Sequence, residues 1–306
     1  MKFLVVGASG FIGGHILNYI KQAGYEVAGT QCQSNQDVLI KFDLEKDSIE
    51  ESVGPSFFKT HKKVFVIICA SLNQMDRCLI EKELSYKINV ERTTQLVRDI
   101  AKYQAIPVFL STSAVYNGEL GYYNEQSVHD PINEYGRQKE AMEQFLLKDV
   151  PRAFILRLDK IVSDDTSGKN LFSEWYQKIR QNQPIICIEQ LFSPTFVKDI
   201  AEAIIKAAQC RLSGAYNVVN PEFFTRVDLA KQFIAAVGKE TDVILKSHEE
   251  FNFADRRIKY SYLDSTKFRK ETGMQFTSMR EVFTSFLKSQ EHYDRRNNLT
   301  SVQNRT

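Results

Sequence analysis

The sequence has no marked excess of charge, few cysteines and no long hydrophobic run. Its 40 Lys and Arg residues nearly balance 38 Asp and Glu residues, so the net charge of +2 gives no general attraction to nucleic acid or to an anionic membrane. The five cysteines are odd in number and include no CxxC pair, which indicates neither a disulfide framework nor a zinc site. No apolar stretch approaches the roughly 20 residues that a membrane-spanning helix needs. We therefore expect a cytoplasmic protein with no metal, no nucleic-acid partner and no membrane partner.

The first half of the 306 residues alternates short β-branched runs with longer amphipathic stretches. This alternation is typical of βαβ units and a parallel sheet. Strands are expected at residues 2–6, 26–28, 38–42, 63–68, 106–110 and 153–156, and helices at 11–23, 85–103 and 133–148. The sequence therefore predicts an α/β fold with a Rossmann-type doubly wound parallel sheet.

The pattern changes after about Asp159, where helical stretches are separated by short strands. Helices are expected at 170–181, 197–208, 226–236 and 278–288, and a strand at 215–219. We expect a dinucleotide-binding domain at 1–160 and a smaller C-terminal α/β substrate lobe at 161–288, some segments of which have room to return to the sheet. Residues 289–306 are polar and nearly free of aliphatic side chains, so we expect a flexible tail there.

A glycine-rich turn, residues 7–13 (GASGFIG), lies between the first expected strand and the first expected helix. Gly7 permits a tight turn, Gly10 allows a pyrophosphate to approach the backbone, and Gly13 lets the helix pack closely on the strand. The helix N-terminus adds unpaired N–H donors for the same anion. An ordinary glycine-rich turn is the alternative, but the strand–turn–helix context is the one that a dinucleotide site requires.

Tyr135 and Lys139 lie four residues apart, which places both on one face of an expected helix. A cationic neighbour stabilises a tyrosinate and lowers the pKa of the tyrosine from its usual value near ~10. We therefore expect Tyr135 to exchange a proton with a carbonyl or alcohol substrate. Such a pair also occurs by chance on solvated helix faces.

Thr112 follows the buried run 106–110 at its carboxyl end, within the hydroxyl-rich segment 111–116. Ligands bind at the carboxyl ends of the strands in an open parallel sheet. The Thr112 hydroxyl can therefore hydrogen-bond the substrate oxygen that Tyr135 protonates. Together, the glycine turn, Thr112 and the Tyr135–Lys139 pair form a specific pattern.

With these motifs the sequence resembles the extended short-chain dehydrogenase/reductase superfamily, of the NAD-dependent epimerase/dehydratase type. It is most similar to the dTDP-4-dehydrorhamnose reductase-like sugar-nucleotide reductases, with matching segments at 83–90, 111–125, 193–201, 214–217 and 256–264. The resemblance implies that Thr112, Tyr135 and Lys139 are catalytic. Tyr135 would supply the proton, while Lys139 would hold the nicotinamide ribose and tune the tyrosine.

The motifs and the resemblance together assign two binding sets. The cofactor set is Gly7, Ser9, Gly10, Phe11, Ile12, Gly13, Thr30, Gln31, Asp43, Leu44, Cys69, Ala70, Ser71, Asn89, Tyr135 and Lys139. The substrate set is Ser113, Tyr116, Ser193, Thr195 and Arg256. Arg157 and Lys160 follow a strand closely and suit either a phosphate or a salt bridge.

The loop after the second strand contains no carboxylate before Asp37 and no arginine or lysine. A carboxylate there would select NAD by bonding the ribose 2′-hydroxyl and repelling a 2′-phosphate. Thr30, Gln31 and Ser34 offer only neutral donors, which bind phosphate more weakly than charged ones. We expect NADP or NAD, with NADPH slightly favoured, and we expect Asp at position 31 to favour NADH.

The resemblance implies NAD(P)-dependent reduction of a nucleotide-activated 4-keto-6-deoxy sugar. An epimerase or dehydratase that recycles its cofactor internally is one alternative, and the run Ser111-Thr112-Ser113 is closer to the epimerase version of the motif. Asn117 stands where the reductases usually have Asp, which leaves the particular sugar open. A non-catalytic, cofactor-binding regulatory subunit is another, although it would have no need of all three of Thr112, Tyr135 and Lys139. The expected partners are a nucleotide sugar and a second copy of the chain in a homodimer.

Overall fold

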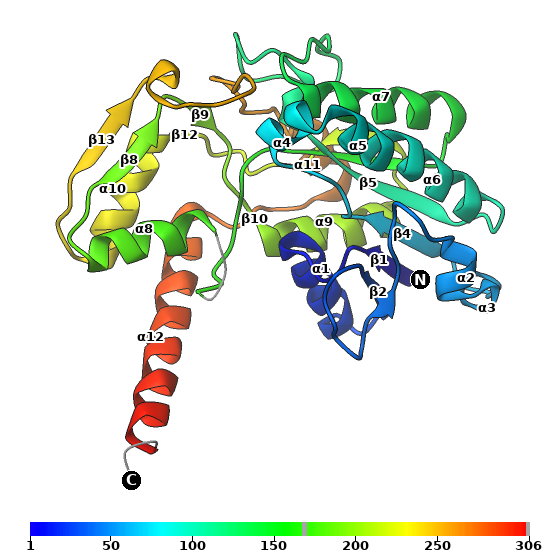
Figure 1. Cartoon of the computed structure of the whole chain (residues 1–306), viewed down its shortest axis with the longest axis horizontal. Helices are drawn as coiled ribbons and strands as arrows, with labels where there is room; N and C mark the ends of the chain where they lie inside the picture. The colour runs from blue at the N-terminus through cyan, green and yellow to red at the C-terminus, as the bar shows by residue number, and fades with distance from the viewer. Residues whose placement is uncertain (167–169, 304–306) are drawn as a thin grey trace.

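A seven-stranded parallel sheet forms the centre of the computed structural model, which describes residues 1–166 and 170–303, and side chains of 1–166 and 170–295 (Figure 1). The strand order is β11-β6-β5-β4-β1-β2-β3, so the chain fills one side of β1 first and then crosses to the other side with β4. Such a reversal marks the binding crevice of an open α/β sheet. The predicted doubly wound fold is confirmed. The strands are β1 (Lys2–Val6), β2 (Glu26–Gln31), β3 (Ile40–Lys41), β4 (Val64–Ile68), β5 (Ile106–Thr112), β6 (Phe154–Leu158) and β11 (Gly214–Asn217).

Helices cover both faces of this sheet, which explains why its inner strands are almost wholly apolar. On one face, α1 and α9 pack against each other and share a core with β1, β5 and β6. On the other face, α6 and α7 share a second core with apolar side chains of β1 and β4. The helices of this part are α1 (Phe11–Gln22), α2 (Ile49–Val53), α3 (Pro55–Phe58), α4 (Met75–Ile80), α5 (Lys82–Tyr86), α6 (Thr93–Ala101), α7 (Glu134–Asp149), α9 (Val197–Cys210) and α11 (Thr266–Thr272).

A smaller lobe lies beside the sheet and has its own aromatic core (Figure 1). Phe172, Trp175, Phe233 and Phe286 pack together there, with Phe172 stacked on Phe233 at 5.1 Å between ring centres. The lobe contains β7 (Ile161–Val162), α8 (Leu171–Arg180), β8 (Ile185–Ile188), β9 (Leu191–Phe192), β10 (Thr195–Phe196), β12 (Phe224–Thr225), α10 (Arg226–Val237), β13 (Val243–Lys246) and α12 (Met279–Gln303).

Two segments beyond residue 160 belong to the sheet rather than to the lobe. Strand β11 pairs in parallel with β6, and α9 packs on α1. Helices and short strands of the second half occur both on the sheet and in the lobe, so the sequence pattern does not say on which unit a segment packs. The helix expected at 85–103 is interrupted by a π-helical segment (Lys87–Arg92) between α5 and α6.

The C-terminal segment expected to be a tail continues α12 as far as Gln303. Residues 304–306 lie outside the described residues, and flexibility of the segment 289–306 stays a prediction. None of the helices in the described part of the chain is long and apolar enough to cross a membrane.

Candidate active site

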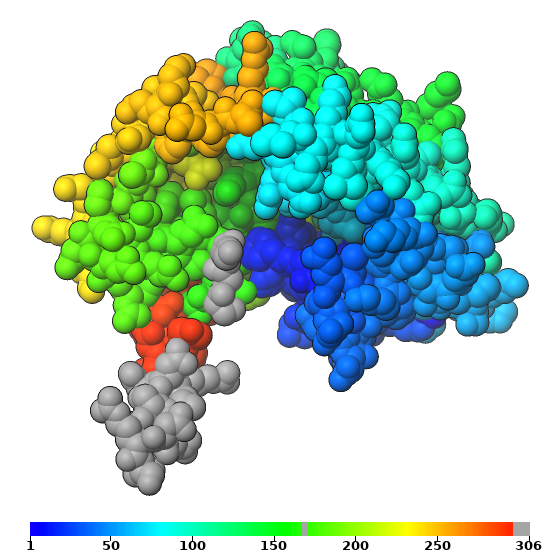
Figure 2. All heavy atoms as spheres, in the orientation of Figure 1, coloured from blue at the N-terminus to red at the C-terminus, as the bar shows by residue number. Residues whose placement is uncertain are grey.

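Three cavities join into one groove at the carboxyl edge of the sheet (Figure 2). The coenzyme cavity (about 600 Å³) is lined by the glycine turn, the loop after β2 and residues 69–73. The cavity that the predicted catalytic residues line, here called the catalytic cavity (about 420 Å³), shares Phe11, Ile12 and Cys69 with the coenzyme cavity. The outer cavity (about 340 Å³) lies between the catalytic cavity and the lobe. It shares the lining residues Thr112 and Asp159 with the catalytic cavity. The groove therefore runs continuously from the glycine turn to the lobe.

The glycine turn has the geometry that a pyrophosphate cradle needs. Gly7 has φ +87°, and a Cβ there would lie 2.8 Å from the Ala70 nitrogen. A Cβ on Gly13 would lie 2.3 Å from the Gly7 oxygen, so α1 can approach the turn only with glycine at this position. Gly10 lines the coenzyme cavity and is the N-cap residue of α1. Because no side chain caps this helix, its first amides are open to an anion.

The loop after β2 lines the coenzyme cavity, but Gln31 does not present its amide there. The buried Gln31 side chain donates through Nε2 to the carbonyl oxygens of Gln36 (2.8 Å) and Leu39 (3.1 Å). Gln31 therefore holds the loop in shape. The expectation that Asp at position 31 would favour NADH stays a prediction, and that change would also remove these bonds. The next residue, Cys32, is exposed and lines the cavity.

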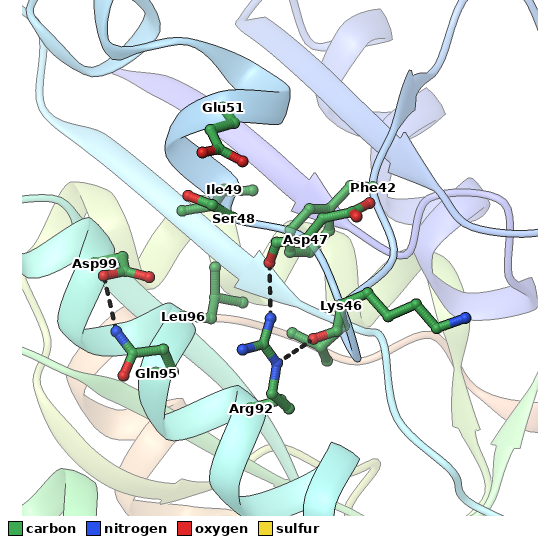
Figure 3. A pocket seen from close by; sticks show the side chains of 11 residues that line it. Phe42, Lys46, Asp47, Ser48, Ile49, Glu51, Arg92, Gln95, Leu96 and Asp99 are labelled. Carbon is green, nitrogen blue, oxygen red and sulfur yellow. Dashed lines mark hydrogen bonds between the residues drawn. The ribbon is translucent and has the colours of Figure 1, made fainter.

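Asp43 and Leu44 line the coenzyme cavity, as expected, and Arg92 holds their loop in place (Figure 3). Arg92 donates through Nε to the Leu44 oxygen at 3.0 Å and through Nη2 to the Asp47 oxygen at 2.8 Å. A separate cavity of about 340 Å³ lies around these contacts and contains none of the catalytic set. Arg92 therefore fixes the loop that lines the coenzyme cavity without lining that cavity itself.

Asn89, also expected to bind the cofactor, acts on the same cavity indirectly. Its Oδ1 accepts from the Leu72 nitrogen, and its Nδ2 donates to the Leu72 oxygen, both at 2.8 Å. Nδ2 also lies 2.8 Å from Oε1 of Gln138 on α7. Asn89 is buried outside the cavity lining, so it ties the loop after β4 to α7.

Thr112, Tyr135 and Lys139 all line the catalytic cavity. Thr112 is the last residue of β5, and Tyr135 lies in the first turn of α7. A Cβ on Gly136 would lie 2.1 Å from the Ala114 oxygen, so α7 can approach the segment after Thr112 only with glycine at this position. The Tyr-Gly pair thus brings the hydroxyl-bearing residues of β5 and α7 to one cavity.

Burial controls the ionisation of this set. It raises the pKa of Tyr135 well above the usual value and lowers the pKa of Lys139 to about 8. Lys139 Nζ donates to the Leu110 oxygen at 2.8 Å and lies 5.6 Å from the centre of the Tyr135 ring. Desolvation of the Tyr135 hydroxyl therefore opposes the expected lowering of its pKa by Lys139, which stays a prediction. Tyr135 stays protonated at neutral pH, as a proton donor must.

Ser113, Ser193 and Thr195 lie around Asp159 at the far side of Thr112. Ser113 Oγ donates to Asp159 Oδ1 at 3.1 Å, and the Ser193 nitrogen donates to Oδ2 at 2.7 Å. Burial raises the pKa of Asp159 to about 6. Ser113 and Asp159 line the outer cavity, whereas Ser193 and Thr195 are buried behind it. Sequence reasoning missed Asp159, whose signal is its place directly after the buried strand β6.

Arg256 and Tyr116 do not line any cavity of the groove. Arg256 is exposed, whereas its neighbour Arg257 lines the outer cavity and forms an ion pair with Asp76 at 2.8 Å. Tyr116 is fully buried, and its hydroxyl donates to the Asn124 oxygen at 2.9 Å. Because the two arginines are adjacent, the sequence does not show that Arg257 lines the outer cavity while Arg256 is exposed.

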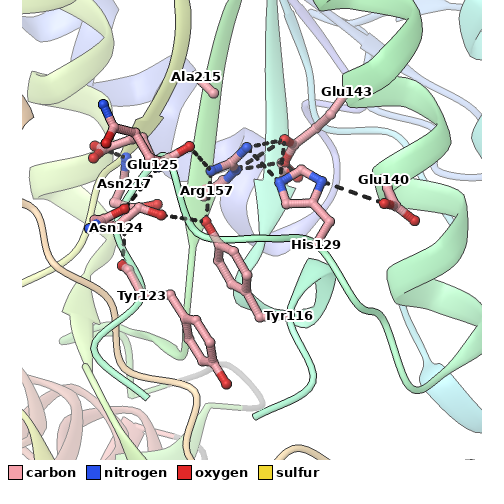
Figure 4. Close-up of polar contacts among 12 residues, drawn as sticks. Tyr116, Tyr123, Asn124, Glu125, His129, Glu140, Glu143, Arg157, Ala215 and Asn217 are labelled. Atoms are coloured by element: carbon pink, nitrogen blue, oxygen red, sulfur yellow. Dashed lines mark hydrogen bonds and ion pairs between the residues drawn. The ribbon is translucent and has the colours of Figure 1, made fainter. Parts of the chain in front are cut away.

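A buried polar network supports the catalytic elements from the core (Figure 4). Arg157 Nη2 donates to Glu143 Oε2 at 2.7 Å, and both side chains are almost fully buried. Ser111, next to Thr112, donates to Glu143, and Arg157 Nη1 donates to the Tyr116 hydroxyl at 2.7 Å. Of the two alternatives for Arg157, the salt bridge is confirmed. The network joins β5, β6 and α7. Its residue on α7 is Glu143, which lies one helical turn after Lys139.

Three known proteins are similar to the chain over most of its length. It is 27% identical to the spore coat polysaccharide biosynthesis protein SpsK of Bacillus subtilis (94% of this chain, 97% of that protein). It is 23% identical to methionine adenosyltransferase 2 subunit beta of Xenopus tropicalis (74% and 70%). The NADP complex of dTDP-4-dehydrorhamnose reductase from Bacillus anthracis superimposes with a TM-score of 0.82 at 25% identity (94% and 99%).

The residues of the groove account for these likenesses. A glycine cradle opens onto a helix N-terminus, and a Thr, a Tyr and a Lys line the cavity next to it. Across the described residues no three His, Cys, Asp or Glu side chains are arranged to hold a metal ion. The family described as "RmlD substrate binding domain" matches residues 1–292. The chain belongs to this family, within the NAD(P)-dependent short-chain dehydrogenase/reductase oxidoreductases.

Proposed function

We propose that this oxidoreductase uses NADPH to reduce the C4 carbonyl of a nucleotide-linked 4-keto-6-deoxy sugar. One observation carries the proposal: Thr112, Tyr135 and Lys139 line a cavity that is continuous with the glycine cradle on one side and with the lobe on the other. A reductase needs this order of sites, with the coenzyme, the proton donor and the substrate in a row.

Each of the three residues has a distinct role in the proposed reaction. The Tyr135 hydroxyl, which forms no hydrogen bond with any described residue, gives its proton to the carbonyl oxygen. The Thr112 hydroxyl holds that oxygen, and Lys139, fixed by the Leu110 carbonyl, holds the nicotinamide ribose. The coenzyme supplies the hydride that reaches the carbonyl carbon. A protonated tyrosine favours this direction of the reaction.

The test is a panel of nucleotide-activated 4-keto sugars with NADPH, followed by the absorbance of the reduced coenzyme. The proposal expects steady NADPH oxidation with at least one sugar, in proportion to the sugar consumed. An epimerase would change the sugar without net oxidation of NADPH. A relative carries the name of a subunit, so a non-catalytic role is the other outcome: coenzyme binding with no turnover of any sugar.

Cys32→Asp should shift the coenzyme preference towards NADH by about tenfold or more. The new carboxylate would enter the coenzyme cavity while the Gln31 bonds that hold the loop remain. Two like charges about 4 Å apart near a protein surface repel by roughly 4 kcal/mol before screening. The ratio of kcat/KM for NADPH to that for NADH measures the shift, with Cys32→Ser as control. An unchanged ratio in Cys32→Asp would place the adenosine ribose elsewhere.

The proposal includes the cytoplasm as the compartment, because reduced coenzyme and nucleotide sugars are both made there. A homodimer stays a prediction, which sedimentation of the purified chain would test.

A further inference from the structure

Two cationic side chains, Lys160 and Arg226, lie in the wall that the catalytic and outer cavities share. Lys160 follows the carboxyl end of β6, and Arg226 begins α10 of the lobe. Thr112 and Asp159 line both cavities as well. One cation therefore comes from the sheet and the other from the lobe, and both line the two cavities that Thr112 also lines.

Neither cation forms an ion pair with a described residue, although the carboxylates of Glu174 and Asp159 lie near both of them. The Lys160 side chain makes no hydrogen bond with any described residue. The Arg226 side chain donates only through Nε, to Gln190 Oε1 at 3.0 Å, and its guanidinium lies over the Phe192 ring at 5.3 Å. The carboxyl of Asp159 already accepts from Ser113 and from the Ser193 nitrogen.

Such an arrangement costs folding free energy, since a charge that leaves bulk water without a partner is destabilising. Burial and the positive charge of Arg226 together lower the pKa of Lys160 to about 8. The chain could relieve this cost with an apolar residue at either position. A ligand that brings negative charge into the groove would account for keeping both cations.

We propose that Lys160 and Arg226 form a subsite for an oxyanion of the substrate, next to the carbonyl that is reduced. This inference rests on the proposed function and adds to it a contact for an anionic group of the substrate. The shared chemistry has two sources: the diphosphate that links sugar and nucleotide, and a carboxylate on the sugar ring. A guanidinium fork and an ammonium bind either oxyanion through charge-assisted hydrogen bonds.

The test measures the binding of three probes to the purified protein by calorimetry: inorganic pyrophosphate, UDP-glucose and UDP-glucuronic acid. Hydrogen bonds to charged groups contribute about 1.5–3 kcal/mol, so Lys160→Met and Arg226→Gln should each weaken binding by about 10-fold to 100-fold. A loss for all three probes assigns the subsite to the diphosphate. A loss for UDP-glucuronic acid alone assigns it to a sugar carboxylate.

Unchanged affinity of all three probes in both variants overturns the proposal, as does failure of all three to bind the wild-type protein. Lys239→Met and Arg152→Gln, which change exposed residues outside the groove, are the matched controls and should bind as the wild type does. The assay needs no turnover. If the variants lose affinity while no sugar is reduced, the subsite stands and the proposed function fails.

Stability separates this role from a structural one. Lys160→Met removes an unpaired charge, so its Tm without ligand should equal or exceed that of the wild type. A Tm well below that of the wild type would mean that Lys160 holds the fold together, and would overturn the inference. Lys160→Arg keeps the charge and should restore probe binding.

The pH dependence gives a second readout. A bound anion raises the pKa of Lys160 above its value of about 8, so affinity should fall as the pH rises above 8. Below about pH 6 protonation of Asp159, whose pKa is about 6, removes a negative charge that faces Lys160 and should strengthen binding further. Arg226, Glu174 and Asp159 face Lys160, and His248 lines the outer cavity. The guanidinium of Lys160→Arg does not titrate in this range, so this variant should lose the fall above pH 8. A fall that persists in Lys160→Arg would assign the pH dependence to another group.

Discussion

Replacing Tyr135 with Phe should lower kcat by about 100-fold or more and leave coenzyme affinity unchanged. General acid catalysis by a positioned side chain contributes on this scale. The Tyr135 hydroxyl lines the catalytic cavity and has no hydrogen-bond partner among the described residues, so its removal leaves no polar group of the protein unpaired. Steady-state kinetics with NADPH and the sugar found in the panel, together with coenzyme titration, measure both quantities.

The control for this substitution is Tyr122→Phe, which removes the hydroxyl of an exposed tyrosine outside the groove. It should leave kcat within about twofold of the wild-type value, because a surface substitution away from the site changes little. A kcat of Tyr135→Phe that is close to normal would remove Tyr135 from the role of proton donor.

Glu143→Gln should lower the free energy of unfolding by about 3–5 kcal/mol, since removing one partner of a buried ion pair leaves the other charge uncompensated. Arg157 depends on Glu143 for its charge partner (Figure 4). Ser111 donates to the same carboxylate. Urea unfolding measures the loss through the midpoint and slope of the transition.

An exposed ion pair provides the comparison. Glu81→Gln breaks the pair of Arg77 with Glu81, which are 2.9 Å apart on the surface of α4, and should cost no more than about 1 kcal/mol. Equal losses in the two variants would mean that the buried network adds no stability beyond that of a surface pair.

The sequence predicted the sheet well, because the sheet follows from local patterns. The apolar runs that became β1, β4 and β5 are continuous, as strands buried on both faces must be. Gly7, Gly10 and Gly13 lie where a strand meets a helix, and Thr112 ends a strand, so their common edge could be deduced.

Side-chain direction was the part that the sequence could not supply. Gln31 and Cys32 are neighbours and both line the coenzyme cavity, yet the Gln31 amide bonds the backbone of the following loop, whereas Cys32 is exposed. Arg226 reaches the groove from the lobe, and its contact with the sheet domain depends on how two units pack rather than on any local motif. The raised pKa of Tyr135 likewise follows from burial, which spacing alone does not report.

The central claim is that hydride passes from the reduced coenzyme to the sugar while Tyr135 gives the proton. The most direct measurement uses NADPH carrying deuterium at the transferring position, with mass spectrometry of the sugar product. The account predicts one deuterium at the former carbonyl carbon for each NADPH oxidised, and a rate of transfer that falls by about 100-fold in Tyr135→Phe. A product without deuterium, or a sugar converted while the NADPH stays reduced, would contradict it.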